Sequence, residues 1–261
     1  MDSTNPVNFN WLHFTERWAD LATSQGLQPK VLATTPAGPL LAWEKAGRGP
    51  TVYISAGIHG DEPAGPLAVM QLLESGLFTA ELNWRICPAL NPTGLSLGVR
   101  DNHLGLDLNR DYFLRVSAEV TAHARWIEDR PPPDLFLSLH EDWEVNKFYL
   151  YEINTGNDEP HVARGILRGV SKHFQPQDSA LIDDHAPREP GWIFHEPEPD
   201  EPHGWPEAIF LVKRGCPLSF TFETPSGAPL PDRVAAHCTA VESALLLKGL
   251  IQKARMVTEE S

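Results

Sequence analysis

One stretch decides the architecture of this chain: Ile54-Ser-Ala-Gly-Ile-His-Gly-Asp-Glu-Pro-Ala-Gly65. Residues 51–58 are apolar and β-prone, and glycines mark the end of the run, so we expect a buried strand that stops abruptly. Residues 64–73 are expected to continue as a helix. In an open α/β sheet, ligands bind at the carboxyl ends of the strands. His59 and Glu62, on the turn between strand and helix, are therefore expected to face a ligand site.

Two later strands are expected to bring further polar groups to the same edge of the sheet. Residues 134–140 form an apolar run that ends in a histidine, and residues 217–223 form one that ends in a glutamate. A lone histidine at a strand end is more often a hydrogen-bonded residue of the core or rim, but the combination of groups favours a metal site. Two histidines and one glutamate leave zinc a fourth position for water, which is the catalytic rather than the structural arrangement. The candidate zinc ligands are His59, Glu62 and His140.

Strand-like and helical runs alternate along the whole chain, which predicts an α/β fold with a mixed, mostly parallel sheet and helices on both faces. The length of 261 residues fits a single domain. Strands are expected at residues 31–34, 40–44, 51–58, 83–90, 134–140, 148–153 and 217–223, with the first two paired as a hairpin. Helices are expected at residues 11–24, 64–73, 118–128, 162–173 and 233–255.

Charge and hydropathy exclude several classes of partner. The formal net charge of -14 argues against nucleic acid or an anionic membrane as the main partner. No apolar stretch is long enough to cross a bilayer. Residues 1–20 lack the basic start and apolar run of a signal peptide. Cys87, Cys216 and Cys238 form no spaced pair, so buried free thiols are expected. Together these features predict a cytoplasmic protein.

The segment of residues 91–110 predicts a second element of the site. Its glycines and proline indicate a winding loop, and it carries Arg100, Asn109 and Arg110. Arginine grips a carboxylate with two parallel hydrogen bonds, so two arginines in an acidic chain indicate anion recognition. The alternative is structural, with the arginines paired to surplus acidic residues. Because the segment lies near the candidate zinc ligands in the sequence, a loop that binds an anionic group is the favoured interpretation.

Residues 187–206 form a proline-rich acidic segment, in which no regular structure is expected. A segment of this length without regular structure is uncommon in a compact domain unless it has a functional role. It also precedes the strand that ends in Glu223. It is expected either to form a wall or lid over the site or to be a solvated surface loop. Glu141 and Asp142, directly after His140, are expected to be strand-end acids in water rather than partners of arginines or substrate amines.

The motifs in combination resemble those of the zinc metallocarboxypeptidase superfamily, which also includes murein-peptide amidases and the succinylglutamate desuccinylase/aspartoacylase branch. They are His59-Gly-Asp-Glu62, Arg100-x-Asn-x-x-Gly-x-Asp-Leu-Asn-Arg110, His140 and Phe220-Thr-Phe-Glu-Thr-Pro225. The resemblance extends from about Thr51 to Pro225. It implies a phosphorylase/hydrolase-like fold of the zinc-exopeptidase type.

The resemblance also implies a role for each group. The three candidate ligands would hold one zinc ion per chain, and Glu223 would be the general base and acid. Arg100 would stabilise the oxyanion, whereas Asn109 and Arg110 would bind the terminal carboxylate of the substrate. Asp107 matches the position of a carboxylate that orients the first histidine ligand.

Three functions remain open at this point. The first is a hydrolase that cleaves the terminal amide bond of a small peptide bearing a free carboxylate, and the motifs around Glu223 and Arg100 favour it. The second is deacylation of an N-acyl amino acid. The third is a non-catalytic relative, which is disfavoured because all the catalytic groups are present. One departure is that digestive-type carboxypeptidases carry a mobile tyrosine before the catalytic glutamate, whereas this chain has no tyrosine after Tyr149 and Tyr151.

Overall fold

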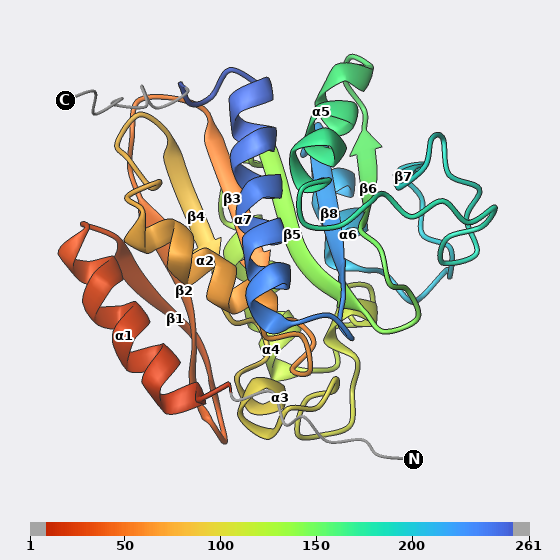
Figure 1. Ribbon diagram of the computed structural model, residues 1–261. Helices are drawn as coiled ribbons and strands as arrows, with labels where there is room; N and C mark the ends of the chain where they lie inside the picture. Colours follow the sequence, from red (N-terminus) through yellow and green to blue (C-terminus); the bar gives the residue numbers. More distant parts are fainter. Residues whose placement is uncertain (1–8, 253–261) are drawn as a thin grey trace.

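The computed structural model describes residues 9–252, which fold around one eight-stranded sheet (Figure 1). The strands lie in the order β1-β2-β4-β3-β5-β8-β6-β7. The neighbours among β4, β3, β5 and β8 run parallel, as do β6 and β7, whereas β1–β2, β2–β4 and β6–β8 are antiparallel. The bounds are β1 Gln28–Thr35, β2 Gly38–Lys45, β3 Thr51–Ala56, β4 Asn83–Cys87, β5 Leu135–Asp142, β6 Tyr149–Asn154, β7 Trp192–Phe194 and β8 Leu218–Pro225. The predicted mixed, mostly parallel sheet is confirmed.

Helices cover both faces of the sheet, which is the second part of the predicted fold (Figure 1). One face carries α1 Trp11–Ser24, α2 Ala64–Glu74, α5 Pro160–Val170 and α7 Leu230–Leu247. The other carries α4 Ala118–Glu128 and α6 Glu207–Lys213. The short helix α3 Pro92–Leu97 and the 3-10 turn η1 Leu108–Arg110 belong to the segment between β4 and α4. Such two-sided cover is what a parallel sheet needs to keep both faces out of water.

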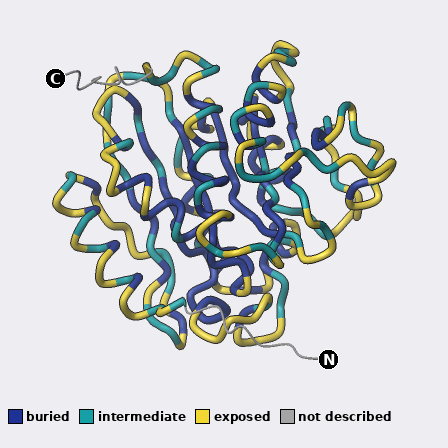
Figure 2. Tube along the Cα trace, in the orientation of Figure 1, coloured by how far each residue is buried: buried dark blue, intermediate teal, exposed yellow. Residues whose placement is uncertain are grey.

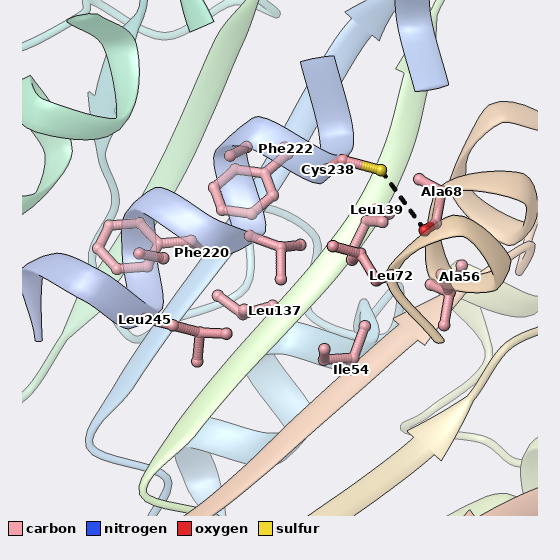
Figure 3. Packing of buried hydrophobic residues seen from close by; sticks show 14 of the residues in the cluster. Ile54, Ala56, Ala68, Leu72, Leu137, Leu139, Phe220, Phe222, Cys238 and Leu245 are labelled. Carbon is pink, nitrogen blue, oxygen red and sulfur yellow. Dashed lines mark hydrogen bonds between the residues drawn. The ribbon is translucent and has the colours of Figure 1, made fainter. Parts of the chain in front are cut away.

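Side chains of the central strands alternate between the two layers of core. Ile54, Leu137 and Phe220 lie at paired positions on three adjacent strands and face α2 and α7 (Figure 3). Tyr53 and Phe136, one position earlier on their strands, face the opposite layer, where their rings stack with centroids 5.0 Å apart. The central strands are accordingly the most buried part of the chain, whereas the outer surfaces of the helices are exposed (Figure 2). Because both faces of the central strands are buried, their sequences are continuous apolar runs rather than alternating polar and apolar residues.

Three expected elements differ from the structure. The proline-rich segment 187–206 is not wholly irregular, because the proline-free Trp192–Phe194 pairs with β6 as β7. The segment 91–110 is not only a loop, since it contains α3 and η1, and α6 was not anticipated. The last helix ends at Leu247 rather than 255, and Gly249 follows with a φ of +68°. Residues 253–255 of the expected helix lie outside the described part of the chain.

The three cysteines are buried and free, as expected. Within residues 9–252, no helix has the length and apolar character needed to cross a membrane. The cytoplasmic location stays a prediction.

Candidate metal centre

The first two candidate ligands are placed by the tight turn between β3 and α2. The backbone of Gly60 donates to the carbonyl of Arg100 at 3.2 Å, so the turn lies against the segment between β4 and α4. A Cβ at Gly60 would come within 1.9 Å of the carbonyl carbon of Gly94. Only a glycine therefore permits this close approach of two backbones. The result is that His59 and Glu62 point inward at the carboxyl end of β3.

The structure brings the three candidate ligands together. His59 Nδ1 lies 2.5 Å from one carboxylate oxygen of Glu62, and His140 Nδ1 lies 3.0 Å from the other. One donor atom from each residue falls within 4.8 Å of the others, and all three side chains are buried. His140 reaches this point because β5 lies directly beside β3. The group has the donor types and the closeness of a zinc site with three protein ligands.

The electrostatics of His59 favour a cation at this position. Its Nε2 lies 3.2 Å from Asp107 Oδ1, and a carboxylate oxygen only accepts, so Nε2 carries a hydrogen and Nδ1 faces Glu62. Burial lowers the pKa of His59, but the carboxylates of Glu62 and Asp107 outweigh it and raise that pKa to about 9. The site thus stabilises positive charge between His59 and Glu62. A metal ion bound to Nδ1 of His59 would supply the positive charge that this position stabilises.

The other two ligands have the protonation states that a metal requires. Burial lowers the pKa of His140, which keeps its imidazole neutral. Burial opposes the charge of Glu62, but His59 and His140 hold the pKa of its carboxyl well below the ordinary value. Metal ligands must be neutral imidazoles and ionised carboxylates. The residues present therefore fit a divalent metal ion.

Glu223 lies beside this group because β8 lies between β5 and β6. It pairs in register with His140 on one side and with Tyr149 on the other. Burial, followed by the negative charges of Glu62 and Asp142, raises the pKa of Glu223 well above its ordinary value. A raised pKa is a feature of carboxyl groups that act as general bases and acids.

The predicted anion-binding residues line the same cavity as Glu223. Arg100 donates to Asp107 Oδ2 from Nε at 3.2 Å and from Nη2 at 3.0 Å, and its Nη1 lies 3.6 Å from Glu62. Asn109 accepts from the backbone N–H of Glu207 at 2.9 Å. Arg110 is exposed, with Nη1 3.1 Å from the carbonyl of Asn109. Arg100 and Arg110 therefore bring positive charge to the cavity that Glu223 also lines.

The cavity has a volume of about 330 Å³, which suits a small ligand. The proline-rich segment forms part of its wall through His195, Asp200, Glu201, Gly204 and Pro206. Tyr149 and Tyr151 also line it, and their hydroxyl groups donate to Asp142 at 2.8 Å and to Asp183 at 2.5 Å. The sequence patterns did not single out Asp183 and His195, because nothing local places them near β5 or β8.

The expectation that Glu141 lies in water is wrong. Glu141 is buried, forms an ion pair with Arg233 of α7, and accepts from the backbone N–H of Ala64 at 2.7 Å. It therefore anchors the first turn of α2 to β5 and α7, directly after the candidate ligand His140 in the chain. Asp142 is partly buried, lines the cavity and accepts from the Tyr149 hydroxyl.

A buried polar network behind the cavity was also missed from the sequence. Glu207, at the start of α6, accepts from the hydroxyl groups of Tyr53 and Ser55, both at 2.7 Å. His123 of α4 lies between the hydroxyl groups of Tyr53 at 2.8 Å and Tyr112 at 2.7 Å. Burial raises the pKa of Glu207 to about 7. Since the backbone of Glu207 also bonds Asn109, this network positions one of the predicted anion-binding residues.

Comparison with known families gives one partial match. The model of the succinylglutamate desuccinylase/aspartoacylase catalytic domain matches residues 48–130. These residues include two of the candidate ligands and all the predicted anion-binding residues. No curated protein matches the chain at a significant level.

Solved structures resemble nearly the whole chain. A proposed metallopeptidase from Shewanella amazonensis SB2B is 26% identical, with a TM-score of 0.81 over 92% of this chain and 93% of that one. A proposed metallopeptidase from Shewanella denitrificans OS217 is 27% identical, with a TM-score of 0.79 over 91% and 90%. A metallo-carboxypeptidase from Pseudomonas aeruginosa, in complex with (2-guanidinoethylmercapto)succinic acid, is 21% identical and has a TM-score of 0.62 over 90% and 69%. At that identity it shows similarity of fold alone.

Proposed function

Because the chain belongs to the zinc metallocarboxypeptidase-like superfamily, we propose that it is a zinc-dependent hydrolase. Its substrate would be a small peptide with a free carboxylate, cleaved at the terminal amide bond. One observation carries the proposal: His59, Glu62 and His140 converge at one point of a cavity that Glu223 also lines. This combination offers a metal-binding group and a proton acceptor within one small site.

The chemistry would be divided among these groups. The two histidines and Glu62 would hold one zinc ion, which lowers the pKa of a coordinated water and polarises the scissile carbonyl. Glu223 would accept the proton of the attacking water and return it to the departing amine. Its raised pKa supports this double role.

The arginines and Asn109 of the cavity would orient the substrate. Arg100 lies next to Glu62 and would stabilise the oxyanion that develops on the scissile carbonyl. Asn109 and Arg110 would bind the free carboxylate of the substrate and so select the terminal bond. Asp107 would keep both His59 and Arg100 in place, because each of its oxygens bonds one of them.

A second function is deacylation of an N-acyl amino acid. The family match on residues 48–130, to the desuccinylase/aspartoacylase catalytic domain, favours it. The similarity of more than nine-tenths of the chain to proposed metallopeptidases favours the peptidase. Both reactions would use the same ligands and base, so the substrate alone distinguishes them.

Metal content tests the metal centre. We expect zinc-loaded His140→Ala to hold one equivalent less than the wild type, because it lacks a ligand. His161→Ala is the matched control, since His161 is exposed on α5. Equal metal content in the wild type and in His140→Ala, at full zinc loading, would refute the assignment of these ligands.

A substrate panel tests the reaction. Short peptides with free carboxyl ends are compared with N-acyl amino acids, and we expect turnover of the peptides. Turnover of only the acyl substrates would support the second function instead. Glu223→Gln should lower kcat by a factor of about 10²–10⁴, the usual contribution of general acid–base catalysis. Glu242→Gln on the exposed side of α7 is its control, and an unchanged kcat in Glu223→Gln would exclude Glu223 as the base.

A further inference from the structure

A second cluster of metal-binding residue types lies on the wall of the cavity. His185, His195 and Asp200 come from the segment between α5 and α6, and their donor atoms lie within 4.8 Å of one another. His195 and Asp200 line the same cavity as Glu223. None of the three is among the ligands, the base or the anion-binding residues of the proposed function.

Hydrogen bonding determines which nitrogen of each histidine is free. Nδ1 of His185 lies 2.5 Å from the carbonyl oxygen of Asp183, and Nδ1 of His195 lies 2.6 Å from that of Glu196. A carbonyl oxygen only accepts, so both Nδ1 atoms must carry hydrogen. In the neutral imidazoles, Nε2 is therefore an electron-pair donor in both residues. A backbone carbonyl on the other ring nitrogen is the usual support of a metal-bound histidine.

Both free nitrogens face the same carboxylate. Nε2 of His185 lies 3.3 Å from Asp200 Oδ1, and Nε2 of His195 lies 3.2 Å and 3.4 Å from the two oxygens. Two lone pairs directed at an anion repel it unless positive charge lies between them. That charge is either an added proton on each ring or one cation shared by all three groups.

The candidate metal centre shows the same pattern. There, Asp107 binds the hydrogen on Nε2 of His59, and the remaining nitrogen faces the carboxylate of Glu62. The second cluster repeats this arrangement twice around Asp200. Each of the two imidazoles that face Asp200 is thus fixed by a carbonyl acceptor on its other nitrogen, an arrangement that metal-bound histidines share.

We propose that His185, His195 and Asp200 form a second metal site, separate from the first and specific for a divalent transition metal such as zinc. Two imidazole nitrogens and one carboxylate favour zinc, nickel or copper over magnesium or calcium, which prefer oxygen ligands. The Asp200 side chain is 67% exposed, so the ion would enter from solvent and would keep open positions for water. The exposure also predicts weaker binding than at the buried first site.

Neighbouring side chains support the geometry of this site. The ring of Tyr151 lies edge-on to both imidazoles, with centroids 5.5 Å from His185 and 5.9 Å from His195. Its hydroxyl group donates to the carboxylate of Asp183, whose backbone carbonyl orients His185. Tyr151 thus positions both imidazoles from β6, and the site does not depend on the flexible ends of long side chains.

Zinc titration of the protein at pH 7.5 tests the proposal, with bound metal counted at equilibrium against buffer that contains a known, saturating concentration of free zinc. We expect about two equivalents in the wild type and one in either His140→Ala or His195→Ala. The double variant should bind none. His203→Ala is the matched control, because His203 is exposed on the same segment but outside the cluster, and it should retain both equivalents.

The His140→Ala variant gives the clearest test, because it lacks a ligand of the first site and so reports zinc binding at the second site alone. One equivalent retained there and lost on adding His195→Ala would support the proposal. No zinc bound there at saturating concentration would overturn it and leave the cluster as an ion pair between protonated histidines and Asp200. If His195→Ala binds none while His140→Ala binds one, the second site exists and the first assignment fails.

Asp200→Asn provides a second test that should leave the fold intact, because the Asp200 side chain is exposed. Removing the charge should weaken zinc binding in the His140→Ala background by at least about tenfold. Unchanged affinity would exclude Asp200 as a ligand and overturn the site as proposed.

Discussion

Asp107 connects the candidate metal centre to the predicted anion-binding residues. One of its carboxylate oxygens accepts from Nε2 of His59 and from the backbone N–H of Asn109. The other accepts from the guanidinium of Arg100. A single side chain therefore holds a candidate metal ligand, the proposed oxyanion-stabilising group and the start of the η1 turn. At the residue scale, shared contacts of this kind therefore hold the proposed site together.

Asp107→Asn should weaken zinc binding at the first site by about 10–100-fold, the usual effect of removing a partner of a ligand histidine. The neutral amide no longer favours the required tautomer of His59. Competition with a zinc chelator measures the affinity, and excess zinc should restore part of the activity. Asp20→Asn on the exposed side of α1 is the control. Equal affinities of the Asp107→Asn variant and the wild type would contradict this role.

Arg100 and Arg110 should affect different kinetic constants. Arg100→Gln should lower kcat by about 10²–10³, since a group that stabilises the oxyanion acts only in the transition state. Arg110→Gln should mainly raise KM, because the free carboxylate is bound equally in the ground and transition states. Steady-state kinetics on the best substrate separate the two. A rise in KM alone for Arg100→Gln would assign that residue to binding.

At the scale of elements, the site depends on close packing between the β3–α2 turn and the start of α3. Gly60 and Gly94 meet backbone to backbone, and the cap of α3 is made by Asn91, whose side chain accepts from the N–H of Gly94 at 2.8 Å. The same asparagine donates to the carbonyl of Arg100 at 3.1 Å. The segment that carries His59 and Glu62 and the segment that carries Arg100 are therefore held close together.

Gly60→Ala should force these segments apart. The new methyl group would overlap the backbone of Gly94, so we expect a loss of roughly 1–3 kcal/mol in stability, as for overpacking of a core. Zinc affinity at the first site should fall with it. Gly227→Ala is the matched control, because a Cβ there meets nothing within 4 Å. Urea unfolding and zinc titration check both effects, and a Gly60→Ala variant as stable as the control would contradict the close packing.

At the scale of the whole molecule, one buried polar network joins the sheet to both helices of the α4–α6 layer. Glu207 of α6 bonds Tyr53 and Ser55 of β3, and His123 of α4 bonds Tyr53 and Tyr112. Burial raises the pKa of Glu207 to about 7 and lowers that of His123 to about 3. The network is therefore most favourable when both groups are neutral, which links global stability to pH.

The raised pKa of Glu207 determines the sign of that link. The folded state holds the proton up to about pH 7, whereas the unfolded state releases it near its ordinary value of 4.5. The stability from Glu207 is thus complete below pH 4.5 and is lost between pH 4.5 and 7. Relative to Glu207→Gln, the wild type should lose up to roughly 3 kcal/mol over this range, at 1.36 kcal/mol per unit of pKa. Urea unfolding of both proteins at pH 5 and 8 measures it, and a difference independent of pH would refute it.

Local sequence patterns are enough to predict most elements and the residue types of the candidate site. Helices 11–24 and 118–128 and the strands around His140 and Glu223 follow from local periodicity, glycines and prolines. These signals lie within about ten residues of one another, so they can be read without knowing the fold. The choice of His59 and Glu62 had the same local basis, since both belong to one turn.

Which of these residues come into contact depends on the tertiary fold. His140 approaches Glu62, and Glu223 lies beside His140, because β5 stands between β3 and β8 in the sheet. Strand order depends on long-range packing of helices and strands, which no local pattern records. The same packing buries Glu141 against Arg233 and places the proline-rich segment on the cavity wall. Local sequence therefore specifies the chemical groups, whereas the packing of distant strands specifies their partners.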